Sequence, residues 1–163
     1  MKTINKSKII IATGGTGGHV FPAYSLAKNL NKNDYLVEII TDKRGLKFLD
    51  TKKDIKFILN NSTTIFKKKI INSFLSIFVI FFSYIRSLLI LYKAKPMLVF
   101  GMGGYASFPV CIAARTLNIP FIIYENNIQI GKSNKYLLPF AFKIFVSYSD
   151  LVGIKKKYSQ KVI

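Results

Sequence analysis

The chain has 163 residues, of which 50% are hydrophobic, so its length and composition fit one folded domain and exclude a disordered chain. The formal net charge of +18 favours polyanionic partners, namely anionic lipid, nucleic acid or phosphorylated ligands, although a plain bias toward lysine would give the same total. The single cysteine, Cys111, excludes an internal disulfide, and we expect it to be a small buried residue of a helix.

Short apolar runs alternate with helical patterns along the chain. The runs are continuous rather than alternating, which is typical of a parallel sheet covered on both faces. In chain order we expect a strand at Lys8–Ala12, a helix at Ala23–Asn31, a strand at Leu36–Thr41, a helix at Arg44–Leu49, strands at Ile55–Leu59 and Met97–Phe100 around a helix at Ile70–Tyr92, a helix at Pro109–Leu117, a strand at Phe121–Tyr124, a helix at Lys132–Leu138 and a strand at Lys143–Val146. This order predicts an α/β fold, a doubly wound, Rossmann-like parallel sheet over residues 1–163.

Two glycine-rich turns each follow a predicted strand and lead into a helix. They are Gly14–His19, with the sequence GGTGGH, and Gly101–Tyr105, with the sequence GMGGY. Such a unit points backbone N–H groups and the positive end of a helix dipole at an incoming anion. In a sheet of order 3-2-1-4-5 the two turns follow neighbouring strands at the point where the winding reverses, which is where ligands bind. The turns therefore predict one crevice for a phosphate- or pyrophosphate-bearing ligand.

A nicotinamide enzyme is a competing interpretation of the first turn. Asp42, at the end of the second predicted strand, sits where a ribose-binding acid would lie in such an enzyme. The turn itself does not have the G-x-G-x-x-G fingerprint, because position 20 is Val20.

The longest predicted helix, Ile70–Tyr92, is strongly apolar. It could lie on the domain with a second apolar face toward a membrane surface, be a fully buried crossover helix, or span a membrane. Its place between the third and fourth strands and the presence of Arg86 argue against a span. The basic flanks, Lys67–Lys69 on one side and Lys93 and Lys95 on the other, give no orientation bias and suit anionic head groups. We therefore expect a helix that lies at an anionic membrane surface.

Three segments together resemble the MurG family of bacterial peptidoglycan GlcNAc transferases, two-domain enzymes with the GT-B fold. The first is Gly14–Ala23 and the second is Gly101–Pro109. The third is Tyr124–Asn127, followed by Gly131 and Asn134, which is similar to the family pattern H-E-Q-N-x-x-x-G-x-x-N. Here tyrosine replaces the first histidine of that pattern and asparagine replaces its glutamine, and both changes keep a hydrogen-bonding group. The resemblance covers nearly the whole chain in the same order.

The resemblance implies an inverting glycosyltransferase of peptidoglycan synthesis. Such an enzyme moves GlcNAc from UDP-GlcNAc to the C4 hydroxyl of undecaprenyl-pyrophosphoryl-MurNAc-pentapeptide, as a peripheral protein at the cytoplasmic face of the bacterial inner membrane. The chain matches the acceptor-binding half of the family. We expect the donor-binding C-terminal domain to be absent and the chain to be inactive alone, unless a partner chain supplies that domain. No cofactor is expected, and no cluster of carboxylates predicts a metal.

Nine residues are candidates for the site. His19 and Glu125 are the candidate catalytic residues. The resemblance marks as substrate-binding residues Thr16, Gly17, Gly18, Gly103, Gly104, Tyr105 and Asn127. The dipole of the helix that follows His19 disfavours its charged form, so a neutral imidazole could accept a proton from the acceptor hydroxyl or hydrogen-bond a phosphate. Glu125 could act as a base, orient a sugar hydroxyl, or only cap nearby backbone N–H groups.

Two other functions compete with this one. The first is a membrane-docking subunit of a split, two-chain transferase of lipid-linked substrates. The second is a basic nucleic-acid-binding module, which needs basic residues interleaved with exposed aromatic residues. Because most aromatic residues here lie in apolar runs, we expect no nucleic acid partner.

Overall fold

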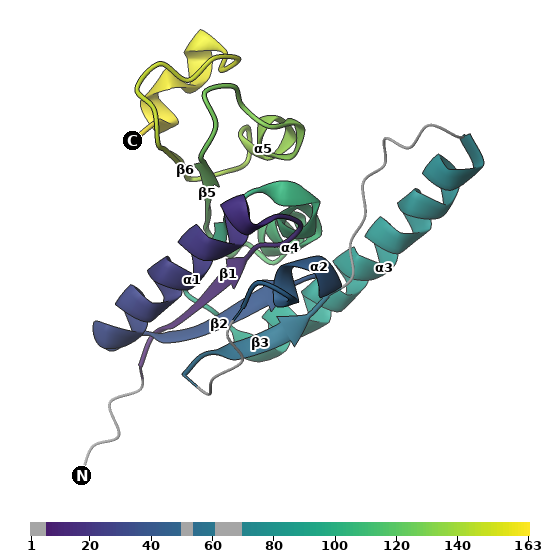
Figure 1. The fold of residues 1–163 in the computed structure, drawn as a ribbon, viewed down its shortest axis with the longest axis vertical. Helices are drawn as coiled ribbons and strands as arrows, with labels where there is room; N and C mark the ends of the chain where they lie inside the picture. The colour runs from purple at the N-terminus through teal and green to yellow at the C-terminus, as the bar shows by residue number, and fades with distance from the viewer. Residues whose placement is uncertain (1–5, 50–53, 61–69) are drawn as a thin grey trace.

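The computed structural model describes residues 6–49, 54–60 and 70–163, and it has one parallel sheet with helices on both faces (Figure 1). The strands are β1 (Lys8–Ala12), β2 (Leu36–Thr41), β3 (Lys56–Leu59), β4 (Leu98–Gly101), β5 (Phe121–Glu125) and β6 (Lys143–Val146). Their order across the sheet is β3-β2-β1-β4-β5-β6, and each neighbouring pair is parallel. The predicted doubly wound sheet is therefore confirmed, and the winding reverses between β1 and β4 as expected.

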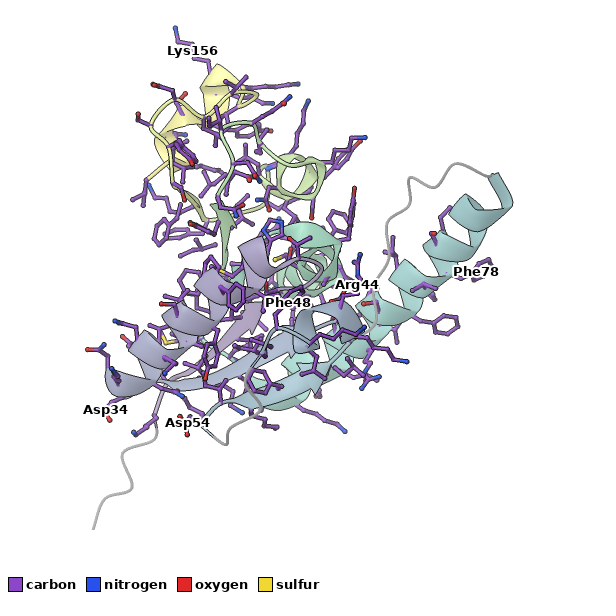
Figure 2. All side chains as sticks on the ribbon, viewed as in Figure 1. Asp34, Arg44, Phe48, Asp54, Phe78 and Lys156 are labelled. Atoms are coloured by element: carbon purple, nitrogen blue, oxygen red, sulfur yellow. The ribbon has the colours of Figure 1, made fainter. Side chains whose placement is uncertain are left out.

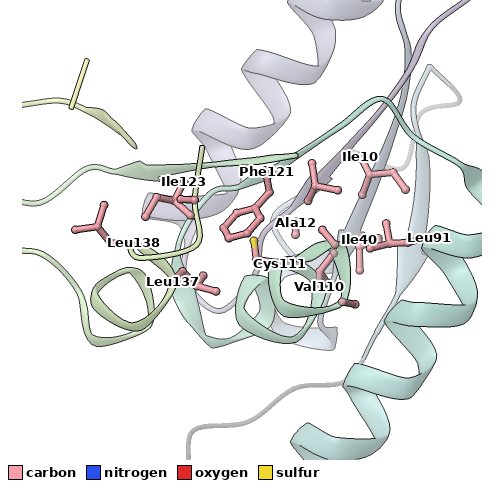
Figure 3. Packing of buried hydrophobic residues seen from close by; sticks show 14 of the residues in the cluster. Ile10, Ala12, Ile40, Leu91, Val110, Cys111, Phe121, Ile123, Leu137 and Leu138 are labelled. Carbon is pink, nitrogen blue, oxygen red and sulfur yellow. The ribbon is translucent and has the colours of Figure 1, made fainter. Parts of the chain in front are cut away.

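The helices divide between the two faces of the sheet. They are α1 (Gly17–Lys32), α2 (Lys43–Leu46), α3 (Ile70–Ala94), α4 (Gly104–Thr116) and α5 (Lys132–Leu137), followed by the 3-10 helix η1 (Lys156–Lys161). Successive strand residues point to opposite faces. Ile9 and Ile11 of β1 pack in the cluster that contains the buried side of α1. Ile10 and Ala12 pack in the cluster that contains residues of α3, α4 and α5 (Figure 3).

Cys111 lies in this second cluster, close to Phe121 in Figure 3, and is fully buried. The prediction of a small buried cysteine in a helix is confirmed. Burial raises the pKa of its thiol well above the usual range, so the group stays protonated. A Cβ added to Gly101 would lie 2.6 Å from the Cys111 sulfur. Glycine at that position therefore lets α4 pack closely against the end of β4, where the second glycine turn begins.

Two predicted helix starts are wrong. We expected helices to begin at Ala23 and Pro109, whereas α1 begins at Gly17 and α4 begins at Gly104. Pro22 and Pro109, which lie at the predicted starts, each occupy the sixth residue of their helix. Both glycine turns are consequently shorter than expected, and His19 lies inside the first turn of α1.

The inner face of helix α3 combines buried serines with apolar residues, and its outer face carries large apolar side chains. Ser76, Ser83, Ser87 and Leu91 are buried. Ser87 Oγ donates to the Ser83 carbonyl at 2.7 Å, and Asn60 Nδ2 donates to the same carbonyl at 3.1 Å and to Ser87 Oγ at 2.8 Å. The exposed face contains Ile77, Phe78, Val79, Phe81, Phe82, Ile85, Leu89 and Tyr92. Serines therefore let the helix pack closely on the domain while its large side chains face outward.

The exposed face excludes a fully buried crossover helix, since Phe82 is 66% exposed. By length and composition, Ser76–Ala94 would suit a membrane span, with a mean hydropathy of 1.7. Its inner face is nevertheless attached to the domain, because the Tyr84 hydroxyl shares a 3.0 Å hydrogen bond with Thr116 of α4. Figure 1 shows the N-terminal half of α3 extending past the sheet. The basic segment Lys67–Lys69 lies outside the described residues.

Candidate functional site

The two glycine turns meet at the carboxyl ends of β1 and β4. A Cβ added to Gly104 would lie 2.9 Å from the Gly14 carbonyl oxygen, and one added to Gly14 would lie 2.6 Å from Cβ of Ala106. Gly104 also has a φ of +75°, a conformation that glycine adopts easily. The predicted approach of the two turns is therefore present, and side chains larger than hydrogen would push them apart.

A buried carboxylate fixes the shape of the first turn. Asp42 Oδ1 accepts a hydrogen bond from the Gly15 N–H at 3.0 Å and from the Gly45 N–H at 2.7 Å, where it caps α2. Asp42 Oδ2 accepts from Nε and Nη2 of Arg44 at 3.2 and 3.1 Å. Both oxygens are thus engaged with the protein. This geometry disfavours the ribose-binding role that a nicotinamide enzyme would require of Asp42.

His19 lies between the two turns. A Cβ added to Gly103 would lie 2.8 Å from both Nδ1 and Cε1 of the imidazole, so the ring lies directly on the glycine backbone. Burial lowers the pKa of His19, while the charge of Glu125 and the backbone of Met102 act in the opposite direction with smaller effect. Nδ1 is buried and has no well-aligned hydrogen-bond partner among the described residues. The imidazole is therefore neutral at pH 7 and able to accept a proton.

Glu125 is 1% exposed and accepts four hydrogen bonds at the end of β5. Oε1 accepts from the backbone and side-chain nitrogens of Asn127 at 3.1 and 2.7 Å. Oε2 accepts from the Gly131 N–H at 2.8 Å and from Asn134 Nδ2 at 2.9 Å. The carboxylate thus organises the loop between β5 and α5. Its hydrogen bonds match the capping role that was one of three predicted possibilities.

Pro22 and Asn126 connect α1 to this loop. A proline has no N–H, so Pro22 leaves the Gly18 carbonyl without its usual partner four residues later. Asn126 Nδ2 donates to that carbonyl at 2.9 Å. The asparagine that replaces the family's glutamine therefore holds the first turn of α1 against the end of β5.

A cavity of about 320 Å³ lies between these elements. It is lined by six of the nine predicted site residues, namely His19, Gly103, Gly104, Tyr105, Glu125 and Asn127. Thr16, Gly17 and Gly18 lie outside its lining, at the start of α1. Thr16 is the exposed N-cap residue, and its side chain makes no capping hydrogen bond. The first N–H groups of a helix have no partner within it, so this end of α1 can receive an anion.

Sequence reasoning missed other residues of the site. Gly131, Lys132, Ser133 and Asn134 also line the cavity. Asn134 is buried and donates to the Tyr124 carbonyl as well as to Glu125. Asn134 belongs to the third motif, and that position could have marked it as a site residue. Within the part of the chain that the structure describes, no group of three or more His, Cys, Asp or Glu residues could hold a metal ion.

The model of the glycosyltransferase family 28 N-terminal domain matches residues 9–146. A UDP-N-acetylglucosamine--N-acetylmuramyl-(pentapeptide) pyrophosphoryl-undecaprenol N-acetylglucosamine transferase of Rickettsia prowazekii is 37% identical over 156 residues, which cover 96% of this chain and 39% of that protein. The enzyme of the same name from Rickettsia felis is 35% identical, covering 96% of this chain and 42% of that protein. The chain thus spans about two fifths of the length of these relatives.

Solved structures show the same fold. MurG of Acinetobacter baumannii superimposes with a TM-score of 0.76 at 26% identity, covering 92% of this chain and 44% of that chain. A UDP-GlcNAc 2-epimerase of Neisseria meningitidis bound to UDP-GlcNAc superimposes with a TM-score of 0.63 at 17% identity, covering 96% of this chain and 45% of that chain. The second likeness shows the fold alone.

Proposed function

This chain belongs to the glycosyltransferase family 28 N-terminal domain family, and from that premise we propose that it is the acceptor-binding half of an inverting GlcNAc transferase. The donor is UDP-GlcNAc, and the acceptor is the C4 hydroxyl of undecaprenyl-pyrophosphoryl-MurNAc-pentapeptide. The names of the Rickettsia relatives support this substrate pair. The observation that carries the proposal is the cavity in which His19, the second glycine turn and Glu125 meet at the reversal point of the sheet.

His19 is the proposed general base. The neutral imidazole takes the proton of the acceptor C4 hydroxyl while that oxygen forms a bond to the anomeric carbon of GlcNAc and the bond from that carbon to the UDP oxygen breaks. The burial that lowers the pKa of His19 supports this role, because the ring is unprotonated at the start of the step. An alternative role of the same ring is a hydrogen bond to a phosphate.

Glu125 orients the sugar-binding loop. Its bonds to Asn127 and Asn134 hold both amides toward the cavity wall. Asn127 Nδ2 also donates to Asn126 Oδ1 at 3.1 Å, which leaves the Asn127 amide oxygen to accept from a sugar hydroxyl. Glu125 is in this account a positioning residue rather than the base.

The turns bind diphosphate. Gly17 and Gly18 offer N–H groups at the positive end of the 16-residue helix α1, and Thr16 adds a hydroxyl. The second turn, with Tyr105, faces the acceptor. Stabilisation of the leaving UDP requires a donor-binding domain, in the same protein or on a partner chain, because this chain spans only 39% of its Rickettsia prowazekii relative.

The exposed apolar face of α3 docks on the membrane. Among the side chains that the structure describes, eight large apolar ones lie on this face, and the net charge of +18 attracts anionic lipid. The protein is therefore peripheral at the cytoplasmic face of the inner membrane, where the lipid-linked acceptor is presented.

Co-sedimentation with anionic vesicles tests the proposal, with and without the lipid-linked MurNAc-pentapeptide at physiological salt. We expect the acceptor to increase binding. Tyr105→Ala should abolish that increase, because Tyr105 lines the cavity, whereas the exposed Tyr136→Ala on α5 should retain it. Equal binding with and without acceptor would overturn acceptor recognition, and equally strong binding to DNA would favour the nucleic-acid module. Purification of a second, donor-binding chain with this one would favour the split transferase.

A further inference from the structure

Arg44 lies against the first glycine turn although it belongs to none of the three motifs. A Cβ added to Gly15 would lie 3.7 Å from Arg44 Nη2. The Arg44 side chain is 60% exposed, so its guanidinium borders both the turn and solvent. Arg44 belongs to the short helix α2 and is labelled in Figure 2. A cation therefore lies beside Gly15, which directly precedes the Thr16–Gly18 backbone that the proposed function assigns to diphosphate.

Asp42 holds this guanidinium in one orientation. The Asp42 side chain is only 4% exposed and is anchored by the N–H groups of Gly15 and Gly45. It accepts from Nε and Nη2 of Arg44. A guanidinium has five N–H donors, so these two bonds leave three for another partner. The buried carboxylate thus fixes the position of the arginine and keeps one edge of the guanidinium open.

Arg44 balances a negative charge beside the turn. The Gly15 N–H is bonded to Asp42 Oδ1 and so is not offered to a ligand. The Asp42 carboxylate would repel a phosphate, and its ion pair with Arg44 offsets that charge. Of the 25 basic residues only Arg44, Arg86 and Arg115 are arginine. The chain therefore has a planar, bidentate donor at the turn, while it uses lysine almost everywhere else.

We propose that Arg44 contacts the diphosphate of the ligand bound at Thr16–Gly18 and that Asp42 is its positioning residue. This inference rests on the proposed function, since it assumes that this part of the first glycine turn binds diphosphate. The diphosphate belongs either to a prenyl-linked acceptor or to a nucleotide sugar. The guanidinium contributes two parallel N–H donors to adjacent phosphate oxygens, which a lysine ammonium cannot reproduce.

Isothermal titration calorimetry on the purified chain tests the proposal with inorganic pyrophosphate, farnesyl diphosphate and UDP-GlcNAc. Arg44→Ala should weaken pyrophosphate binding roughly ten- to hundredfold, the effect of losing one or two charge-assisted hydrogen bonds. Arg44→Lys should give an intermediate loss. Lys43→Ala, which removes an exposed cation of the same short helix, should change binding less than about threefold. A loss confined to farnesyl diphosphate assigns the acceptor, and one confined to UDP-GlcNAc assigns the donor.

Each outcome separates this inference from the proposed function. Equal binding by Arg44→Ala and the wild type, or equal losses in Arg44→Ala and Lys43→Ala, would overturn the role of Arg44 and leave the proposed function intact. Absence of saturable binding by the wild-type chain to all three ligands would overturn the proposed diphosphate site itself. Thermal unfolding of each variant identifies loss of fold. Arg44→Lys keeps the charge that pairs with Asp42. If Arg44→Ala unfolds, unchanged pyrophosphate binding by Arg44→Lys would overturn the role of the guanidinium.

Discussion

Replacing Glu125 by glutamine should lower the free energy of unfolding by about 2–6 kcal/mol. Each carboxylate oxygen accepts two N–H groups, at distances between 2.7 and 3.1 Å. Glutamine keeps one oxygen and puts an NH₂ group in place of the other, where it meets two donors. An orphaned donor costs about 1–3 kcal/mol when it is buried, so the lower end of the range applies if the NH₂ group faces the part-buried donors of Asn127. Because a domain is stable by only about 5–15 kcal/mol, the change is a large share of the total.

Urea denaturation followed by circular dichroism measures this effect, with a thermal scan beside it. For a chain of this size each kcal/mol shifts the melting temperature by about 2–4 °C, so we expect a decrease of roughly 5–20 °C. Glu38→Gln is the matched control, since Glu38 is the other glutamate and is also buried. Its partners are the part-buried Lys8 and the exposed Lys56, which both donate to Oε1. Glutamine keeps one oxygen that can accept from both lysines, so this change should cost less than Glu125→Gln. If Glu125→Gln is no less stable than Glu38→Gln, the four hydrogen bonds do not hold the loop and the positioning role is refuted.

Three further changes test other parts of the structure. Burial lowers the pKa of His19 below the ordinary 6.5, so the unfolded chain binds a proton more readily than the folded chain. The free energy of unfolding should therefore fall as the pH drops below about 6.5. His19→Gln should remove that part of the pH dependence, as measured by denaturation curves at pH 7.5 and 5.5. Gly103→Ala should destabilise the fold by about 1–3 kcal/mol and shift the imidazole NMR signals, because φ is +84° and the new Cβ meets the His19 ring. Gly18→Ala is the control, since its Cβ would make an ordinary 3.6 Å contact with Asn126, and it should cost less than about 1 kcal/mol. Phe82→Ser on α3 should reduce partition into anionic vesicles about tenfold. Phe21 on α1 is also exposed, and Phe21→Ser should not reduce it. Equal effects of the two changes would contradict docking through α3.

Local patterns predicted the sheet well because its strands are short apolar runs, and the four central strands are mostly buried. The range of β6, Lys143–Val146, matches the prediction, and the reversal between β1 and β4 follows from the order of strands and helices. The starts of α1 and α4 were missed because Pro22 and Pro109 mark helix beginnings in a sequence. In the folded chain Asn126 replaces the hydrogen bond that Pro22 removes, and that contact joins residues 108 positions apart.

The site residues also divide into those that local patterns predicted and those whose roles depend on contacts between distant segments. The glycine turns and His19 carry local signals, since they follow predicted strands and open helices. The role of Asp42 in holding the first turn was not predicted, because its bond to Gly15 joins segments 27 residues apart. The sequence offered Asp42 only as the ribose ligand of a competing nicotinamide enzyme. The inner face of α3 was also unpredictable, because an apolar helix with serines does not reveal which side packs on the sheet. Asn60, from a separate segment, selects that side by bonding to Ser87.

Because the outward face of α3 is apolar and the chain is basic, salt should affect both its association with itself and its association with lipid. In plain buffer the chain presents contiguous aromatic and aliphatic side chains to water, and such a surface favours association between copies. The charge of +18 keeps those copies apart by repulsion over a Debye length of about 10 Å at 0.1 M salt. Raising the ionic strength should therefore weaken binding to anionic vesicles and promote self-association of the free chain. We expect solubility and vesicle binding to decline together along a salt titration.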